Sequence, residues 1–161
     1  MAISGGVWVA AGGHWPEAPA EAVKVSVAAI KQLDHLISEI LRTRDDASKA
    51  QTLANSPLEE KLNAIVGLTL KQPTHAELTA FHAMAHDQAT LPSGRGPQPL
   101  SLAGALNKLK HRDSLGLKFR IDDGLHMLVF LTLGVANIPP SINEVAVASV
   151  CHAARELDGV I

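Results

Sequence analysis

Residues 107–133 read NKLKHRDSLGLKFRIDDGLHMLVFLTL, and the hydrophobic periodicity of the chain changes within this stretch. Up to about Lys110 the apolar residues recur at helical spacing, whereas from Leu115 onward they alternate as in a β-strand. The Asp-Asp-Gly sequence at 122–124 supplies a turn, because glycine adopts left-handed backbone conformations without a steric penalty. The stretch therefore predicts one β-hairpin in a chain whose other apolar spacing is helical.

The length of this turn decides which face of the hairpin is buried. In a three-residue loop, Gly124 takes a left-handed bulge position and Ile121 lies opposite Leu125. A two-residue turn at 123–124 would place Ile121 opposite His126 instead. We favour the three-residue loop because it gathers the apolar side chains on one face, away from the basic ones. That apolar set is Leu117, Phe119, Ile121, Leu125, Met127, Val129 and Leu131.

The remainder of the chain is patterned for helices. Apolar residues recur at helical spacing over 23–41, which indicates a long amphipathic helix. Three sites pair a hydroxyl residue with a glutamate three positions later, as in a capping box. These pairs, Ser56 with Glu59, Thr74 with Glu77 and Ser141 with Glu144, predict helices at about 57–70, 75–89 and 141–158. Ser101 is placed to cap another helix that runs to about Lys110.

The predicted fold is α+β: a predominantly helical bundle of five to six helices with one late antiparallel β-hairpin and a C-terminal helix. At 161 residues, 47% hydrophobic and 19% charged, the chain is expected to form a single domain at 19–161 after a weakly ordered arm at 1–18. The second hairpin strand is apolar on both faces, so a helix or a second copy must cover it. We therefore expect a homodimer.

Composition narrows the class of protein. Aromatic residues make up 3% and the net charge is −2, which argues against a stacking platform for single strands and against a broadly basic DNA-binding domain. Cys151 is the only cysteine, so no intrachain disulfide forms. We find no secretory signal pattern and no apolar run long enough to span a bilayer. The expectation is a soluble cytoplasmic protein that does not engage membranes.

The basic residues around the hairpin form a candidate anion site. Five of the fourteen Lys and Arg residues lie in segment 108–120. The candidate residues are Lys110, His111, Arg112, Lys118, Arg120 and His126, with Lys108 beside them. Cations at helix ends and on strand faces also stabilise folds and keep them soluble, so the cluster has a structural explanation. The functional interpretation is that Arg112 and Arg120 meet a phosphate or carboxylate.

Arg120 and His126 also suggest a nuclease. Their spacing resembles the Arg-x4-6-His element of HEPN-type helical ribonucleases, but in that family the motif lies at a helix, which the turn at 122–124 interrupts here. The resemblance covers two residues and does not assign the family. In the favoured hairpin register the two side chains lie opposite each other, where a neutral His126 could act as a general base on a phosphodiester.

A histidine stripe at 75, 82 and 86 suggests a metal site. His82 and His86 have the i, i+4 spacing that can hold one zinc or nickel ion. The pair resembles part of the three-His site of DinB-like four-helix bundles, a resemblance confined to these two residues. A solvated polar stripe explains the same pattern and is the interpretation we favour, so we expect no cofactor.

Two classes of function follow. The leading hypothesis is a non-catalytic binding or assembly module that engages an acidic partner or a nucleic-acid backbone through segment 108–120. The alternative is a small hydrolase, either metal-dependent through His82 and His86 or nuclease-like through Arg120 and His126. We favour binding because none of the catalytic groupings has a complete set of roles.

Overall fold

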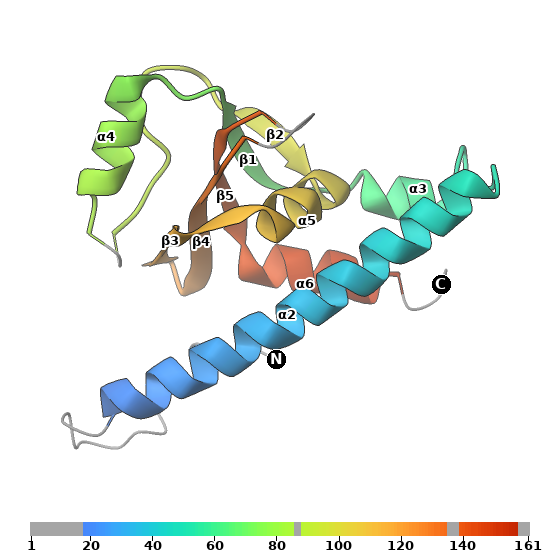
Figure 1. Ribbon diagram of the computed structural model, residues 1–161, viewed down its shortest axis with the longest axis horizontal. Helices are drawn as coiled ribbons and strands as arrows, with labels where there is room; N and C mark the ends of the chain where they lie inside the picture. The colour runs from blue at the N-terminus through green and yellow to red at the C-terminus, as the bar shows by residue number, and fades with distance from the viewer. Residues whose placement is uncertain (1–17, 86–87, 135–138, 158–161) are drawn as a thin grey trace.

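The computed structural model describes residues 18–85, 88–134 and 139–157, with side chains from residue 31 onward (Figure 1). The arm expected at 1–18 lies almost wholly outside the described residues. In chain order the elements are α2 (Ala18–Lys49), α3 (Pro57–Leu62), β1 (Ile65–Lys71), α4 (His75–Ala83), β2 (Gln98–Ser101), α5 (Leu102–Lys110), β3 (Arg112–Asp122), β4 (Leu125–Thr132), β5 (Ser141–Ala146) and α6 (Val147–Arg155).

The described part of the chain is built on a five-stranded antiparallel sheet in the order β2-β1-β5-β4-β3. The expectation of a predominantly helical bundle with one hairpin is therefore wrong. Two segments that we expected to be helical, the second half of 57–70 and the start of 141–158, are β1 and β5. Both contain β-branched residues, which fit a pleated sheet better than a helix: Ile65, Val66 and Thr69 in β1, and Ile142 and Val145 in β5.

Strands β1 and β5 lie unusually close together at Gly67. A Cβ atom on this residue would lie 2.1 Å from the carbonyl oxygen of Glu144. Glycine is therefore required for the approach of the two backbones, not for a turn. The pairing of β1 with β2 also shifts between Ile65 and Gly67, so the strand is irregular at this point.

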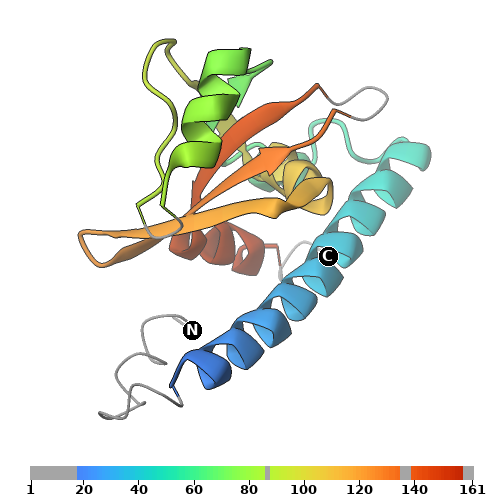
Figure 2. The same ribbon diagram turned by 60° about the vertical axis from the view of Figure 1, so that its left-hand side comes forward.

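Helical layers cover both faces of the sheet. Figures 1 and 2 show α2 and α6 on one side and α4 on the other. The larger core joins α2, α5 and α6 to one face and includes Ile37, Leu41, Leu106, Phe130, Val145 and Leu157. The smaller core lies under α4 and the segment that follows it, and includes Leu70, Phe81, Ala89, Val129, Leu131 and Ile142. The apolar second hairpin strand is thus covered by helices of its own chain over much of its length.

The β3–β4 hairpin turns on two residues, and the three-residue loop that we favoured is wrong. Asp122 pairs with Leu125 and Ile121 with His126. Asp123 and Gly124 have φ values of 46° and 78°. Positive φ at both central positions is the mark of a type I′ turn, for which Asp-Gly is a preferred sequence.

Compared with the register that we expected, the side chains of β4 are shifted by one position relative to those of β3. Phe119 now shares a face with Leu128, while Lys118 shares the opposite face with Val129. The apolar set expected on one side is consequently divided between two. Helical layers cover both faces of the sheet at the base of the hairpin. β4 is therefore buried on both faces there, and a charged side chain of β3 such as Lys118 is buried with it.

Several helix starts were predicted correctly. Thr74 caps α4 in a complete capping box with Glu77, and Ser101 accepts a hydrogen bond from the Gly104 amide at the start of α5. Ser56 caps α3, which ends at Leu62 before β1 begins. The third capping pattern, Ser141 with Glu144, lies in a strand instead. Among the described helices, none combines the length and apolar character that crossing a membrane requires.

Candidate functional site

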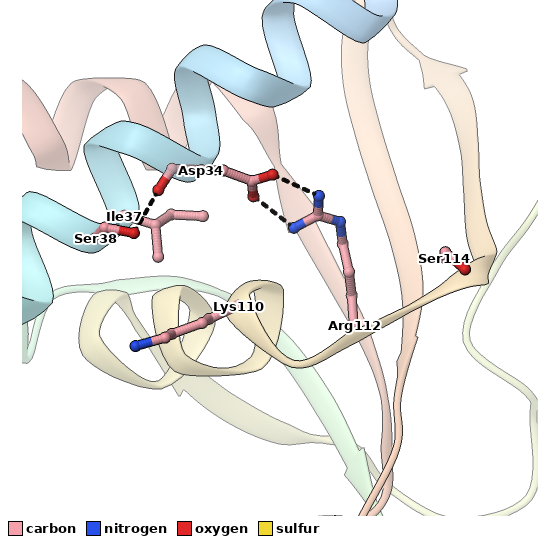
Figure 3. Close-up of a pocket in the computed structure, with 6 residues that line it drawn as sticks. All are labelled: Asp34, Ile37, Ser38, Lys110, Arg112 and Ser114. Carbon is pink, nitrogen blue, oxygen red and sulfur yellow. Dashed lines mark hydrogen bonds and ion pairs between the residues drawn. The ribbon is translucent and has the colours of Figure 1, made fainter.

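A cleft of about 270 Å³ lies between α2 and the corner where α5 passes into β3. Its lining residues are Asp34, Ile37, Ser38, Lys110, Arg112 and Ser114. The first three lie on two neighbouring turns of α2 and the last three at the corner between α5 and β3, as Figure 3 shows. Part of the basic segment singled out in the sequence therefore lines a concave surface.

Arg112 and Asp34 form a bidentate ion pair at one end of the cleft. Arg112 Nη1 lies 2.7 Å from Asp34 Oδ1, and Nη2 lies 3.0 Å from Oδ2. Nη1 also donates to the carbonyl oxygen of Leu109 at 2.8 Å. Within the described residues, three of the five guanidinium N–H groups are used and two remain as donors. The positive charge of Arg112 is balanced, but its hydrogen-bonding capacity is not exhausted.

Lys110 is the exposed cation of the cleft. Its side chain extends along α5 towards the side of Ser38 (Figure 3). Within the described residues, no hydrogen bond or ion pair engages the Lys110 ammonium. Ser38 Oγ donates to the Asp34 carbonyl oxygen at 2.8 Å, which leaves its oxygen as an acceptor. The cleft thus carries one uncompensated positive charge.

Lys118 belongs to the fold and not to an anion site. Its side chain is 4% exposed, and its ammonium donates to the carbonyl oxygens of His82 and Met84 at the end of α4. The same ammonium lies 5.1 Å from the centre of the Phe81 ring. A lysine at the C-terminal carbonyls of a helix satisfies groups that the helix cannot bond itself. Lys118 therefore attaches α4 to the sheet.

Arg120 is also held by neighbouring groups. Its Nη1 donates to Glu144 Oε2 at 2.6 Å and to the Ala89 carbonyl oxygen at 3.0 Å, and its Nη2 reaches Asp122 at 3.2 Å. These carboxylates raise the pKa of the guanidinium further above its ordinary range. The structure does not bring Arg112 and Arg120 to one anion, because Arg112 begins β3 and Arg120 lies near its other end.

Arg120 and His126 lie on opposite faces of the hairpin. His126 pairs with Ile121, and its ring lies 5.6 Å from the Phe119 ring in an edge-on arrangement. Burial lowers the pKa of His126, which favours its neutral form. The sheet therefore separates His126 from the Arg120 guanidinium, whereas a nuclease site would need the two side chains together. His111 caps the end of α5 beside the cleft.

The alternative of a histidine metal site is not assembled by the described residues. Helix α4 ends at Ala83, so the predicted helix to about 89 is too long by more than a turn. His82 is exposed, and His86 lies outside the described residues. Among the residues that the structure does describe, no group of three or more His, Cys, Asp or Glu side chains is arranged to hold a metal ion.

A buried polar row beneath α5 was missed by sequence reasoning. Asn143 accepts from Thr69 Oγ1 at 2.8 Å and donates to Thr132 Oγ1 at 2.9 Å. Beside it, Lys108 Nζ donates to Ser141 Oγ at 2.6 Å. The signal was available, because alternation over 141–146 places Ser141 and Asn143 on the same face as a core valine.

Lys108 and Ser141 make the hydrogen bond of a Ser–Lys catalytic pair, but a substrate has no access to them. Burial, and secondarily the charge of Lys71, lowers the pKa of Lys108. Such a lysine can serve as a general base. Ser141, however, has 0% exposure, so a substrate carbonyl cannot reach its hydroxyl oxygen. The pair is part of the sheet's interior.

No family model matches this chain. No curated protein and no solved structure is significantly similar to it.

Proposed function

We propose that the protein is a non-catalytic binding module that receives a carboxylate side chain of an acidic polypeptide partner in the cleft of Figure 3. The observation that carries the proposal is that the exposed, uncompensated Lys110 and the two remaining N–H donors of Arg112 line the same cleft. A carboxylate in the cleft would accept charge-assisted hydrogen bonds from Arg112, and also from Lys110 once the flexible lysine side chain turns towards it. Segment 108–120 thus contributes two of its cations to binding and the others to the fold.

An acidic polypeptide fits the cleft better than a nucleic-acid backbone does. Binding to a phosphate backbone usually uses several lysine and arginine side chains along one surface. Here Arg112 is balanced by Asp34, and Arg120 by Glu144. Asp34 is also 46% exposed at its side chain and would repel a dense row of phosphates. A single carboxylate avoids most of that repulsion.

The test is a binding titration of the full chain with a fluorescently labelled glutamate-rich peptide. We expect Lys110→Ala to weaken binding on the order of tenfold, because one hydrogen bond to a charged group is worth about 1.5–3 kcal/mol. The affinity should also fall as salt is raised from about 0.02 M to 0.3 M. Fluorescence anisotropy measures both effects.

Lys49→Ala is the matched control, since Lys49 lies in the last turn of α2, away from the cleft residues, and its side chain is 79% exposed. It should bind the peptide as the unmodified chain does. Equal affinities for the Lys110 and Lys49 variants would contradict the proposal. If a single-stranded oligonucleotide binds more tightly than the peptide, the partner of the cleft is a nucleic acid and the choice of an acidic polypeptide is overturned.

A further inference from the structure

The outer part of the β3–β4 hairpin exposes apolar side chains that the helical layers do not cover. Among the described residues, four of the eight exposed large hydrophobic side chains lie on this hairpin: Leu115, Phe119, Ile121 and Leu125. Ile121 is 60% exposed and Phe119 36%, whereas Phe130 at the base of the same face is fully buried. Clustered apolar exposure of this kind marks a contact surface more often than scattered single residues do.

Two of these side chains form one surface with their cross-strand neighbours. Phe119 and Ile121 are two positions apart on β3, and they pair with Leu128 and His126 on β4. Paired residues in an antiparallel sheet point to the same face. We call this surface of Phe119, Ile121, His126 and Leu128 the hairpin face.

The described chain begins on the side of the molecule where the hairpin ends. Figure 2 shows the hairpin tip and the N-terminal half of α2 on the same side of the molecule. Seventeen residues precede α2, which starts at Ala18. A chain of this length spans up to roughly 55 Å when extended, so its reach does not restrict where it can bind.

The composition of this N-terminal segment is suited to an apolar surface. Residues 1–17 read MAISGGVWVAAGGHWPE and contain both tryptophans of the protein, with no lysine or arginine. Tryptophan side chains bury large apolar areas and rank high among the residues that carry binding energy. The segment is tethered to the folded domain, which raises its effective concentration to about the millimolar range.

We propose that residues 1–17 dock on the hairpin face of their own chain through Trp8 or Trp15. This proposal is independent of the carboxylate cleft, which lies at the base of β3 and uses different side chains. The tether and the placement of α2 favour this occupant over a second copy of the protein. Docking in this way covers the apolar side chains that the helices leave exposed.

Intrinsic fluorescence tests the proposal directly in the full chain. Because the protein has two tryptophans and no tyrosine, emission excited in the near ultraviolet reports on the N-terminal segment. We expect the emission to be blue-shifted relative to the urea-unfolded chain and protected from acrylamide. The double variant Phe119→Ser with Ile121→Ser should shift the emission to longer wavelength and increase quenching, with an unchanged far-ultraviolet circular dichroism spectrum.

Ile65→Ser is the matched control, because Ile65 is 63% exposed on β1, away from the hairpin. Its emission should match that of the unmodified chain, as should that of Lys110→Ala. The single variant Ile121→Ser provides the same readout should the double variant unfold. Unchanged emission in folded hairpin variants would overturn the proposal. So would blue-shifted emission that is lost on dilution together with a dimer seen by light scattering, since the occupant would then be a second copy.

Discussion

Some charged side chains of this protein are bonded within the fold, whereas others remain available to bind a ligand. Lys118 and Arg120 bind carbonyl oxygens of residues more than 30 positions away, at Met84 and Ala89. Sequence patterns report neighbours within a few positions, so these partners could not be predicted. The helix caps at Thr74 and Ser101 could be, because their partners lie three residues away.

Glu77 gives a residue-level prediction of pH dependence. The Arg95 guanidinium, together with hydrogen bonds from Thr74, lowers the pKa of Glu77 from 4.5 to about 2. A carboxyl whose folded pKa is depressed contributes stability above its unfolded pKa, and this contribution is lost as the pH falls through the folded value. We therefore expect stability to decline between pH 4.5 and about 2.

Urea unfolding midpoints measured across that pH range check the expectation. Glu77→Gln should lower the midpoint at neutral pH and flatten its dependence between pH 4.5 and 2, because the titrating group is gone. Arg95→Met should flatten the same profile by removing the main cause of the shift. A Glu77→Gln profile that runs parallel to that of the unmodified chain would show that another group is responsible.

Individual helices and strands show where the sequence patterns were ambiguous. Short segments such as 65–71 and 141–146 are too brief for periodicity alone to separate a strand from a helix. The resemblance to a capping box led us to predict a helix at 141–158. In the fold, Ser141 instead accepts a hydrogen bond from Lys108, and Glu144 accepts one from Arg120. Of the candidate anion site, Lys110 and Arg112 line a cleft, whereas Lys118 and Arg120 are held by groups of the fold. The opposing carboxylates came from distant elements and were not foreseen.

Gly67 gives a prediction at the level of the β1–β5 pair. Gly67→Ala should destabilise the protein by about 2–3 kcal/mol or prevent folding, because its Cβ would overlap the Glu144 carbonyl oxygen and neither backbone can yield without breaking the ladder. Gly96→Ala is the control, since a Cβ there meets nothing within 4 Å. Urea unfolding of the two variants should separate them clearly. Equal stabilities would mean that the strands tolerate separation at this point.

The molecule as a whole is a sheet between two unequal helical layers. The sequence correctly indicated an α+β chain with a sizeable apolar core, but it did not indicate two cores. The smaller core beneath α4 depends on few large side chains, above all Phe81, with Lys118 and Arg120 attaching its margin. Such a layer is expected to open locally before the rest of the molecule unfolds.

Hydrogen exchange can test this division between the layers. Phe81→Leu should weaken the α4 layer by about 1 kcal/mol and accelerate exchange of amides in 75–83 and 88–91, while those of α5 and β4 keep their protection. Phe130→Leu, in the larger core, should accelerate exchange in α5 and β4 as well. Uniform acceleration across the chain in the Phe81 variant would indicate one cooperative unit instead of two layers.

The two edges of the sheet differ in their capacity to accept another strand. On one side the sheet ends in β2, which has four residues and contains Pro99, so it offers a short edge with a missing donor. On the other side it ends in β3, which has eleven residues and which, among the residues that the structure describes, pairs on its outer side with Gln88 at Arg120. Growth of this sheet by intermolecular pairing, as occurs in aggregation of partly unfolded chains, should therefore proceed from β3. Gatekeeping substitutions intended to improve solubility, such as an added charge at Leu115, belong on that edge.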